Sequence, residues 1–489
     1  MTRLSLATLD RVTPSWRPPF DPTSLEVGIV HLGLGAFARG HGLVFTQGAV
    51  AATGDTRWGY CGVTQRSRSV LDQLAPQDGL YSVLVRDGSD AVPQVVGTVR
   101  DLLFATEEPE RLTSLLAAAA TRVVTLTVTE KGYRHDPASR RLRADDPDVV
   151  ADLAGREPVT VVGQLVRGLA ARRSADAGPV TLLSCDNLAG NGEVLHDVVT
   201  QFAALLPDVG LRDWIEGNVA FPSSMVDRIT PATTDQDRAD TARLLGLTDE
   251  GVVVTEPFSQ WVVEDTFAAS RPAWQLAGVT LTDDVAPYER IKLRLLNGSH
   301  SMMAYLGLLA GHDYIAEAAG DPAIGRAADR FMQDDVTPGL DVPAGFDLGD
   351  YQEQLRSRWR NVAIRHLLSQ VAMDGSQKIP NRLFGPIRER LASGGQPVAA
   401  TLGLAAWMRF VSAGSSDDGK PLELDDPLAD ILRSAVAGTS TPQAVVSALF
   451  GVTAVFGDLG DDPAVRELVA GHLDTLTRYG ARAAAQAIA

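Results

Sequence analysis

The sequence predicts an α/β protein in which a doubly wound parallel sheet is followed by a mainly α-helical domain. The 489-residue chain exceeds the length at which a single core keeps growing, so two domains are expected. In the first part, β-branched runs alternate with helix-like segments, which is typical of a parallel sheet covered by helices. After about residue 283 long Leu- and Ala-rich segments dominate. We therefore expect domains at 1–283 and 284–489.

The first domain is predicted from short apolar runs and the segments that separate them. A buried strand is expected where an apolar run ends in glycine, and a helix where apolar residues recur at helical spacing. Six segments fit these patterns: strands at 27–35, 58–63, 123–129 and 180–184, and helices at 38–51 and 66–74.

The second domain is predicted to be built from helices joined by polar loops. Its apolar segments are too long for strands, and Pro- and Gly-rich stretches such as 336–350 and 412–427 separate them. The expected helices are 289–309, 323–334, 355–373, 398–410 and 441–449.

The composition excludes several classes of function. A formal net charge of −17 disfavours nucleic acid and anionic membranes as partners. Two distant cysteines suit a reducing cytoplasm, and neither a signal peptide nor an apolar run of ~20 residues is visible. The eight histidines lack zinc-ligand spacing. We therefore expect a cytoplasmic protein without a bound metal.

A glycine motif follows the first predicted strand. Gly33 and Gly35, with Ala38 three residues later, form a G-x-G-x-x-A version of the Rossmann-type dinucleotide fingerprint. Such glycines let backbone N–H groups approach a pyrophosphate at a helix start. The expected cofactor contacts are Gly33, Gly35, Ala36 and Phe37. The alternative is a tight turn between strand and helix with no ligand.

The end of the second strand bears on the choice of cofactor. An acidic residue is usual there when NAD is preferred, but this chain has Thr64 and Gln65 followed by Arg66 and Arg68. Two arginines suit a 2′-phosphate, or they are simply solvated at a helix start. NAD is therefore expected as cofactor, with NADP kept open.

Three polar side chains share one side of the predicted helix that contains Lys292. At about 100° per residue, His300 falls at about 80° and Asn297 at about 140° from Lys292. An amine, an amide and an imidazole on one face can accept a proton and bind an alkoxide. The alternative is a solvated helix face.

Polar residues also follow later strands of the first domain. Glu130 follows one strand, Asp186 and Asn187 follow the next, and Asp227 stands beside Arg228. Sites in α/β sheets lie at the carboxyl ends of strands. The alternative is turn or cap chemistry, which these residue types also favour.

Together these stretches resemble the mannitol dehydrogenase family of polyol-specific long-chain dehydrogenases. The resemblance spans nearly the whole chain: residues 28–37, 221–231 and 256–261, and the pattern K-x4-N-x2-H from Lys292 to His300. It implies NAD(P)-dependent, zinc-independent oxidation of a secondary alcohol in a cleft between a Rossmann-type domain and a helical domain.

The resemblance also implies roles for individual residues. Lys292 would be the general base, although a free lysine with a pKa of about 10.4 needs burial or a nearby cation to act at neutral pH. Asn297 and Asn187 would hold the alkoxide, and His300 would position the substrate. Glu130 is a candidate proton relay. The expected substrate contacts are Asp227, Lys378 and Gln370.

Gln370 is a departure from the pattern of mannitol-oxidising members, in which an arginine stands at this position. The stretch 370–380 is closer to the fructuronate reductase (mannonate oxidoreductase) branch. The expected substrate is therefore a sugar acid, polyol or ketose, of the D-mannonate/D-fructuronate or D-mannitol/D-fructose type. The protein is expected to be a monomer or small homo-oligomer.

Two rival interpretations remain open. Tyr288 and Lys292 match the Y-x3-K pair of short-chain dehydrogenases, in which tyrosine is the base, although such an enzyme leaves the helical half unexplained. The other rival is a non-catalytic dinucleotide-binding sensor, which needs the glycine turn but not the aligned Lys292, Asn297 and His300.

Overall fold

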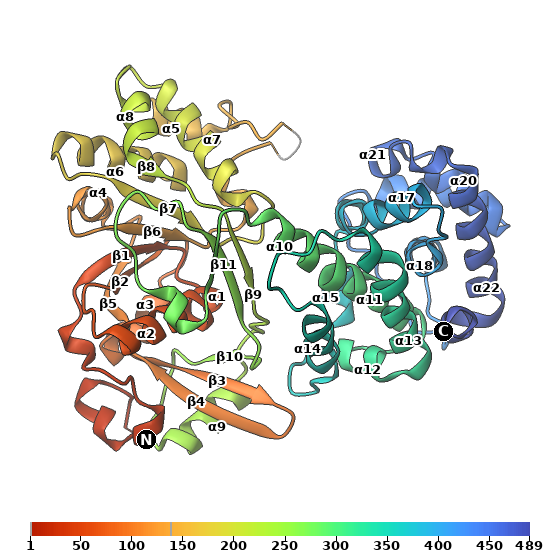
Figure 1. The fold of residues 1–489 in the computed structure, drawn as a ribbon, viewed down its shortest axis with the longest axis horizontal. Helices are drawn as coiled ribbons and strands as arrows, with labels where there is room; N and C mark the ends of the chain where they lie inside the picture. The colour runs from red at the N-terminus through yellow and green to blue at the C-terminus, as the bar shows by residue number, and fades with distance from the viewer. Residues whose placement is uncertain (1, 137–138) are drawn as a thin grey trace. The chain divides into compact units, whose positions relative to one another are not determined.

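The computed structural model describes residues 2–136 and 139–489, and the chain folds into two compact units. They comprise Met1–Ala286, called the sheet unit below, and Pro287–Ala489, called the helical unit (Figure 1). The predicted fold class, a doubly wound parallel sheet followed by a mainly helical part, is confirmed.

The main sheet has six parallel strands in the order β5-β2-β1-β6-β7-β8. From β1 the chain adds β2 and β5 on one side, then returns to place β6 on the other side of β1. The direction of strand addition therefore reverses between β1 and β6, where doubly wound folds bind ligands. The strands are β1 Val27–Leu32, β2 Gly59–Thr64, β5 Val99–Phe104, β6 Val123–Leu126, β7 Val180–Ser184 and β8 Val219–Ala220.

Helices cover both faces of this sheet because its strands are apolar on both sides. In β1, Val30 and Leu32 belong to one buried cluster and Ile29 to the other. The first cluster packs under α4 Pro109–Ala117, α6 Val161–Ser174 and α7 Asn191–Ala204, and the second under α2 Gly42–Thr53. Strands buried on both faces are typical of parallel sheets.

Two three-stranded sheets complete the sheet unit. One joins β10 Val253–Thr255, β3 Tyr81–Asp87 and β4 Asp90–Val96, and the other joins β12 Thr280–Thr282, β11 Gln260–Glu264 and β9 Ser224–Asp227. Its remaining helices are α1 Ala36–Gly40, α3 Ser69–Leu74, α5 Pro147–Leu153, α8 Leu211–Asn218 and α9 Asp235–Leu245, with 3-10 turns η1 Leu6–Arg11, η2 Pro14–Trp16, η3 Pro22–Ser24, η4 Ala75–Gln77, η5 Glu130–Tyr133 and η6 Trp274–Ala277.

Several predicted elements of the sheet unit have different bounds in the structure: the strand predicted at 27–35 ends at Leu32, and the helix predicted at 66–74 begins only at Ser69. The helix predicted at 38–51 is divided into α1 and α2 at His41, whose φ of −127° and ψ of −90° are not helical. The strand predicted at 123–129 ends at Leu126. Beyond it, the N–H groups of Val128 and Thr129 bond to the side chain of Asp186 instead of a neighbouring strand.

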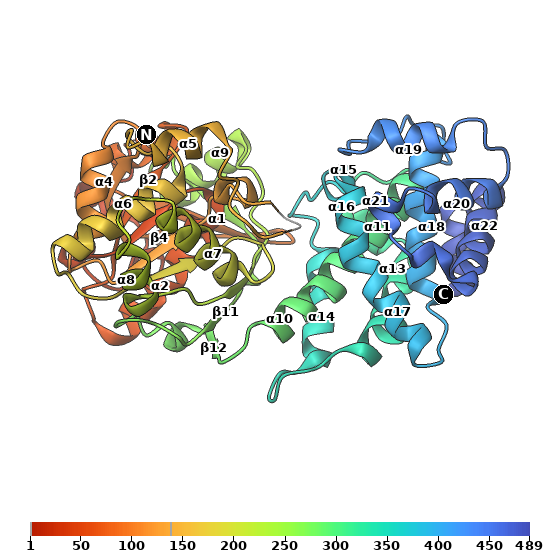
Figure 2. The same cartoon turned by 90° about the horizontal axis from the view of Figure 1, so that it is seen from above.

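In the helical unit, α18 Val398–Ala413 lies between α11 Ser299–Leu309 and α22 Pro463–Ile488 (Figure 2). Most of its side chains are buried. The other helices are α10 Ala286–Ile291, α12 Ile315–Gly320, α13 Pro322–Arg330, α14 Leu348–Arg360, α15 Leu368–Ala372, α16 Gly375–Ile379, α17 Gly385–Ala392, α19 Ala429–Val436, α20 Pro442–Phe450 and α21 Thr453–Phe456, with 3-10 turns η9 Thr337–Gly339 and η11 Leu459–Asp461.

Three segments of the helical unit are π-helical, with N–H groups bonded to the carbonyl five residues earlier. They are η7 Lys292–Gly298, η8 Phe331–Val336 and η10 Pro380–Phe384. The prediction of one regular helix at 289–309 is therefore wrong in its middle, where η7 separates α10 from α11. The helix predicted at 323–334 likewise changes from α13 into η8.

The continuous helix predicted at 355–373 is also wrong. Helix α14 ends at Arg360, and α15 begins only at Leu368. Between them the backbone pairs with the segment before α12: the N–H of Ile315 donates to the carbonyl of His366, and the N–H of Leu368 donates to that of Asp313. These extended hydrogen bonds are incompatible with a helix.

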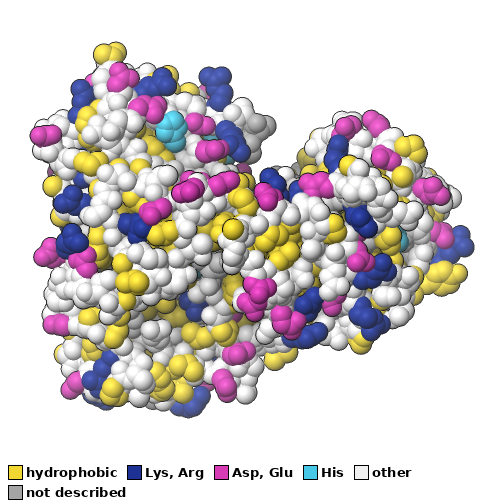
Figure 3. Space-filling view, viewed as in Figure 1, with side chains coloured by type: hydrophobic (Ala, Val, Ile, Leu, Met, Phe, Trp, Pro, Cys, Tyr) yellow, Lys and Arg dark blue, Asp and Glu magenta, His cyan; other side chains and the backbone are white. Residues whose placement is uncertain are grey.

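Within the part of the chain that the structure describes, no helix combines the length and the apolar character needed to span a bilayer. On the face seen in Figure 3, acidic and basic side chains are interspersed over both units.

Candidate functional site

The predicted glycine turn lies at the carboxyl end of β1, next to β6. Gly33 has a φ of +93°, and a Cβ placed there would lie 2.2 Å from the carbonyl oxygen of Thr127. Its N–H donates to the carbonyl of Val63 at 2.8 Å, and its carbonyl accepts from the N–H of Gly35 at 2.6 Å. Both the left-handed backbone and the close approach require glycine.

A buried histidine that the sequence interpretation missed supports this turn. The ring of His31, inside β1, contacts the Oγ1 atoms of Thr125 at 2.7 Å and Thr127 at 3.0 Å, and Thr127 Oγ1 donates to the carbonyl of Gly33 at 2.8 Å. Burial lowers the pKa of His31 to about 4, so the ring is neutral at pH 7. The sequence did contain a signal for this role, because His31 is a polar residue within an otherwise apolar strand.

The residues after the turn form the start of α1. Gly35 precedes α1, and Ala36 and Phe37 are its first residues. The nearest atom to a Cβ added at Gly35 is the carbonyl oxygen of Gly33 at 3.7 Å, so the backbone is open to approach here. The ring of Phe37 stacks on that of His41 with 4.9 Å between centroids.

The two arginines after β2 differ in their surroundings. Arg66 is exposed in the loop between β2 and α3. Arg68 pairs with Glu107 and lies 3.8 Å from a carboxylate oxygen of Asp72. A 2′-phosphate at Arg68 would therefore compete with two carboxylates.

Glu130 and Asn187 are exposed at the carboxyl ends of neighbouring strands β6 and β7. The carboxylate of Asp186 links the two loops, because it accepts hydrogen bonds from the N–H groups of Val128 at 3.0 Å and Thr129 at 2.8 Å. It also accepts one from the hydroxyl of Tyr133 at 2.7 Å. Burial raises the pKa of Asp186 despite these three donors.

Asp227 is buried at the end of β9, opposite Gln260 of β11. Its strand is tied to the loop after β7 through Asn191, whose side-chain amide donates to the carbonyls of Asp186 at 2.9 Å and Ser224 at 2.8 Å. The structure therefore brings Glu130, Asn187 and the strand of Asp227 into one connected region of the sheet unit.

Lys292 and Asn297 are the first and sixth residues of the π-helix η7. Lys292 is buried, with 8% of its surface exposed, and Asn297 is partly buried. In a π-helix, residues five apart are separated by about one turn, so these two residues lie on one side. The predicted angle of about 140°, which assumed a regular α-helix, is therefore wrong.

The three π-helices meet at Gly298. A Cβ at this residue would lie 2.8 Å from the ring of Phe331 in η8 and 3.5 Å from the carbonyl oxygen of Arg382 in η10. The guanidinium of Arg382 donates to Ser301 Oγ at 2.8 Å and to the carbonyl of Asn297 at 3.3 Å. The backbone around Asn297 is thus held from a segment about 85 residues away in sequence. Sequence reasoning missed Arg382.

His300 lies in the first turn of α11 and is buried. Among the residues that the structure describes, its buried Nε2 atom has no hydrogen-bond partner. Its ring centroid lies 5.4 Å from that of His366. Burial, followed by electrostatic interactions with His366, Arg358 and Arg382, holds the pKa of His300 well below its usual value. The ring is therefore uncharged at pH 7.

Lys378 lies on α16, which continues directly into η10. Its Nζ donates to the carbonyl of Val371 at 3.4 Å, and burial, followed by the charge of Arg382, lowers its pKa. Gln370 is exposed on α15, one residue before Val371. The helical unit thus brings Lys292, Asn297, His300 and Arg382 together, whereas Gln370 lies on a separate, exposed turn.

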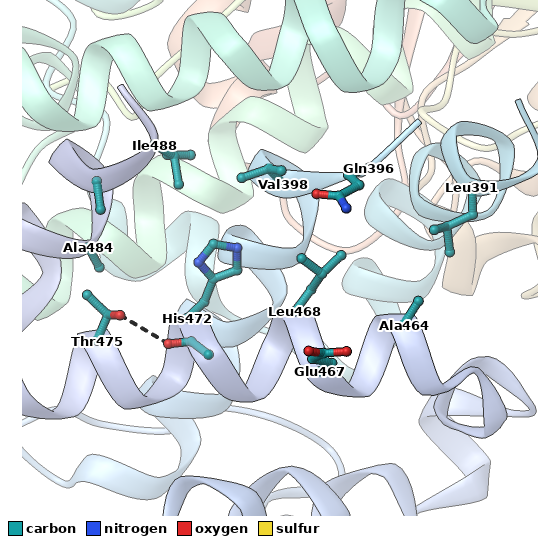
Figure 4. Close-up of a pocket in the computed structure, with 12 residues that line it drawn as sticks. Leu391, Gln396, Val398, Ala464, Glu467, Leu468, His472, Thr475, Ala484 and Ile488 are labelled. Atoms are coloured by element: carbon teal, nitrogen blue, oxygen red, sulfur yellow. Dashed lines mark hydrogen bonds between the residues drawn. The ribbon is translucent and has the colours of Figure 1, made fainter. Parts of the chain in front are cut away.

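A cavity of about 620 Å³ elsewhere in the helical unit is lined by α17, α18, α22 and their connections (Figure 4). His472 and Gln396 are among the lining residues, which include none of the predicted site residues. Over residues 2–136 and 139–489, the structure shows no group of three or more His, Cys, Asp or Glu side chains that could hold a metal ion.

Comparison with protein families covers both units. Residues 27–276 match the mannitol dehydrogenase Rossmann domain, and residues 284–477 match the mannitol dehydrogenase C-terminal domain. The chain belongs to the mannitol dehydrogenase family. It is an oxidoreductase acting on CH–OH groups, as the sequence predicted.

Individual members of the mannitol dehydrogenase family match over most of their length. The chain is 41% identical over 472 residues to the uncharacterized oxidoreductase YdfI of Escherichia coli, covering 95% of this chain and 96% of that relative. It is 38% identical to the D-mannonate oxidoreductase of the same organism, with 92% and 93% covered. The structure of Pseudomonas fluorescens mannitol 2-dehydrogenase in a ternary complex with NAD and D-mannitol matches with a TM-score of 0.86 and 34% identity, covering 100% of this chain and 99% of that chain.

Proposed function

We propose that this protein is a zinc-independent, NAD-dependent oxidoreductase that interconverts a secondary alcohol of an open-chain sugar acid or polyol with the corresponding 2-keto sugar. The observation that carries the proposal is the buried Lys292 on the π-helix of Asn297, followed by His300, whose buried Nε2 has no hydrogen-bond partner among the described residues. An amine, an amide and a neutral imidazole at this spacing supply a base, an alkoxide donor and a substrate contact.

The cofactor proposal is supported by the turn at Gly33 and the open backbone at Gly35, where the strand order reverses. When bound, the nicotinamide accepts or supplies the hydride. A relative's structure contains NAD, and Arg68 is already paired with Glu107. NAD is therefore proposed as the preferred cofactor, and NADP stays a candidate through Arg66.

The proposed proton transfer uses residues of this chain only. In the oxidative direction the amine of Lys292 accepts the hydroxyl proton, and the side-chain amides of Asn297 and Asn187 donate to the developing alkoxide. Amides stabilise this charge without titrating themselves. Neutral His300 orients the substrate hydroxyls, and exposed Glu130 passes the proton to solvent.

Two cations support a sugar acid as the first substrate to test. Lys378 is half-buried, and Arg382, which is also half-buried, lies four residues further on. A carboxylate needs such a partner at its far end, and Gln370 stands where mannitol-oxidising members have an arginine. Asp227 is proposed to bind a substrate hydroxyl.

A panel assay tests this proposal. D-Fructuronate, D-tagaturonate, D-fructose and other ketoses are each supplied with NADH and NADPH, and cofactor oxidation is followed by absorbance. We expect turnover with a hexuronate and NADH. Binding of NADH without oxidation by any of these substrates would support the sensor interpretation and contradict ours.

One substitution distinguishes our proposal from the short-chain dehydrogenase interpretation, in which Tyr288 is the base. Tyr288 lies on α10, and its ring contacts that of Phe346 edge to face. If Tyr288 were the base, Tyr288→Phe would abolish turnover. We expect most of the activity to remain, with the larger loss in Lys292→Ala.

Three further expectations belong to this proposal. The two described cysteines, Cys61 and Cys185, are free and buried, which supports a reducing compartment such as the cytoplasm. We propose that the cofactor domain comprises residues 1–283 and the catalytic domain residues 284–489. We also propose that the protein is a monomer or a small homo-oligomer. Light scattering distinguishes these two states by their molecular mass.

A further inference from the structure

Thr129, between β6 and Glu130, has a backbone conformation that is rare for its residue type. Its φ is 65° and its ψ is 162°. This region is almost restricted to glycine, because a Cβ clashes with the neighbouring backbone, and a β-branched residue is a clear outlier there. Such strain persists only when surrounding contacts impose it, and it clusters at functional sites.

The contacts that impose it come from Asp186. The two oxygens of this carboxylate accept separately, Oδ1 from the N–H of Thr129 and Oδ2 from the N–H of Val128. Oδ2 also accepts from the hydroxyl of Tyr133, which lies 2.5 Å from Ser184 Oγ. Asp186 is itself buried, so these hydrogen bonds are shielded from water.

The hydrogen bonds that Val128 and Thr129 donate to Asp186 are called the clamp below. Both ends of this clamp adjoin residues of the proposed reaction. Glu130 follows the strained Thr129 directly, and Asn187 follows Asp186 directly. The backbone carbonyl of Asp186 is in turn held by the side chain of Asn191, which also bonds to Ser224 of β9. The carboxylate is therefore the link between two exposed loop ends and a buried polar network beneath them.

We propose that Asp186 is a positioning residue: its carboxylate holds the loop after β6 against the loop after β7, keeps Thr129 in its strained conformation, and so fixes Glu130 relative to Asn187. This inference rests on the proposed function for the roles of Glu130 and Asn187. The clamp itself is independent of the substrate, because it is a property of the sheet unit alone.

Asp249 provides a matched control within the same unit. Its buried carboxylate accepts from the N–H of Ser82 at 2.6 Å and from the side chains of Ser82 and Gln77. It therefore resembles Asp186 in burial and hydrogen bonding, but it holds β3 to the loop before β10. It adjoins none of the proposed site residues.

The first experiment compares Asp186→Asn with Asp249→Asn. Both substitutions weaken a buried carboxylate network, so both are expected to lower the melting temperature. Only Asp186→Asn is expected to lower kcat, by at least about tenfold, because small displacements of catalytic groups are costly. Its KM for NADH should stay within about twofold of wild type. An equal loss of kcat in the two variants would overturn the positioning role.

The second experiment uses Thr129→Gly and Thr129→Ala. Its result does not depend on whether the Asp186→Asn variant folds. Glycine adopts this conformation without strain and keeps the backbone N–H that donates to Asp186, so the melting temperature is expected to rise by about 2–4 °C while kcat stays near wild type. Alanine retains the Cβ and should give no such rise. A glycine variant whose melting temperature does not rise above that of the alanine variant would contradict the strain at Thr129 and, with it, the inference.

Failure of the proposed function would be distinguishable from failure of the clamp. If wild-type protein turns over no substrate of the panel, the proposed function fails. Hydrogen exchange then tests the clamp without any substrate: faster exchange at the amides of Val128 and Thr129 in Asp186→Asn, but not in Asp249→Asn, supports it. Unchanged exchange in Asp186→Asn overturns it.

Discussion

In the sheet unit, the candidate residues follow the ends of regular parallel strands, whereas in the helical unit they lie on turns that depart from the α-helix. Glu130 and Asn187 are fixed by side chains that bond to loop backbone, with Asp186 as the central acceptor. Lys292 and Asn297 instead lie on one π-helical turn, which packs against two others at Gly298 and is also held by the side chain of Arg382.

This difference shows two ways in which a fold can position polar groups. Strand ends leave the backbone unpaired, so side chains must restrain the loops that follow. A π-helix keeps its own hydrogen bonds but changes which residues share a side, and such segments are frequent at functional sites. Substitutions in the helical unit should therefore affect chemistry most, and those in the sheet unit cofactor binding and loop geometry.

The largest effect is expected from Lys292→Ala. Loss of a general base should lower kcat by about 10²–10⁴-fold, while the Kd for NADH, measured by fluorescence titration, stays within about twofold. Arg294→Ala is the control on the same π-helix, because Arg294 pairs with Glu389. Similar losses of kcat in the two variants would mean that disruption of η7, not loss of the amine, is responsible.

Asn297→Ala should have the next largest effect. Removal of one alkoxide donor is expected to lower kcat by about 10²–10³-fold, with little change in melting temperature because the carbonyl bonded to Arg382 is retained. Asn381→Ala, on the π-helix η10, is the control and should leave kcat near wild type. If KM for the sugar rises and kcat does not change, Asn297 binds the substrate and the transition state equally strongly, which would contradict its role as an alkoxide donor.

The sheet unit is tested by alanine at two glycines. Gly33→Ala places a Cβ 2.2 Å from a carbonyl oxygen at a φ of +93°, so both melting temperature and NADH affinity should fall. Gly35→Ala meets its nearest protein atom at 3.7 Å, so its melting temperature should stay near wild type while NADH affinity falls about tenfold or more. Unchanged affinity in Gly35→Ala would contradict a pyrophosphate contact there.

Much of the fold could be predicted from the sequence, because strand runs, the glycine turn and the change to Leu- and Ala-rich segments are local signals. The long-range hydrogen bonds and the π-helix that position the candidate site residues could not be predicted. Asp186 was recognised as a residue at a strand end, but not as the acceptor for Val128 and Thr129, which are nearly 60 residues away. The π-helix at Lys292 was missed because its short run of leucines also fits α-helical spacing.

A further expected effect concerns the pH dependence of stability and does not involve the reaction. Burial raises the pKa of Asp335, in η8, to about 6, although its carboxylate accepts the N–H of Ala400 at 2.7 Å. The raised pKa means that the folded state loses stability as pH rises from about 4 to 6, by about 3 kcal/mol at most.

The free energy of unfolding of Asp335→Asn should therefore increase relative to that of wild type as the pH rises from about 4 to 6. Above about pH 6 the difference between the two proteins should stay constant. Urea denaturation at pH 4, 5, 6 and 8 measures the difference. An advantage that does not change with pH would mean that Asp335 is not the titrating group.

The central claim, that Lys292 accepts the substrate proton, is tested most directly by chemical rescue of Lys292→Ala. Small primary amines such as methylamine are added during oxidation of the alcohol identified in the panel, and kcat is measured against amine concentration and pH. We predict that activity returns in proportion to the unprotonated amine, with Arg294→Ala unaffected. Absence of rescue together with unchanged NADH affinity and unchanged melting temperature would contradict the assignment of Lys292 as the base.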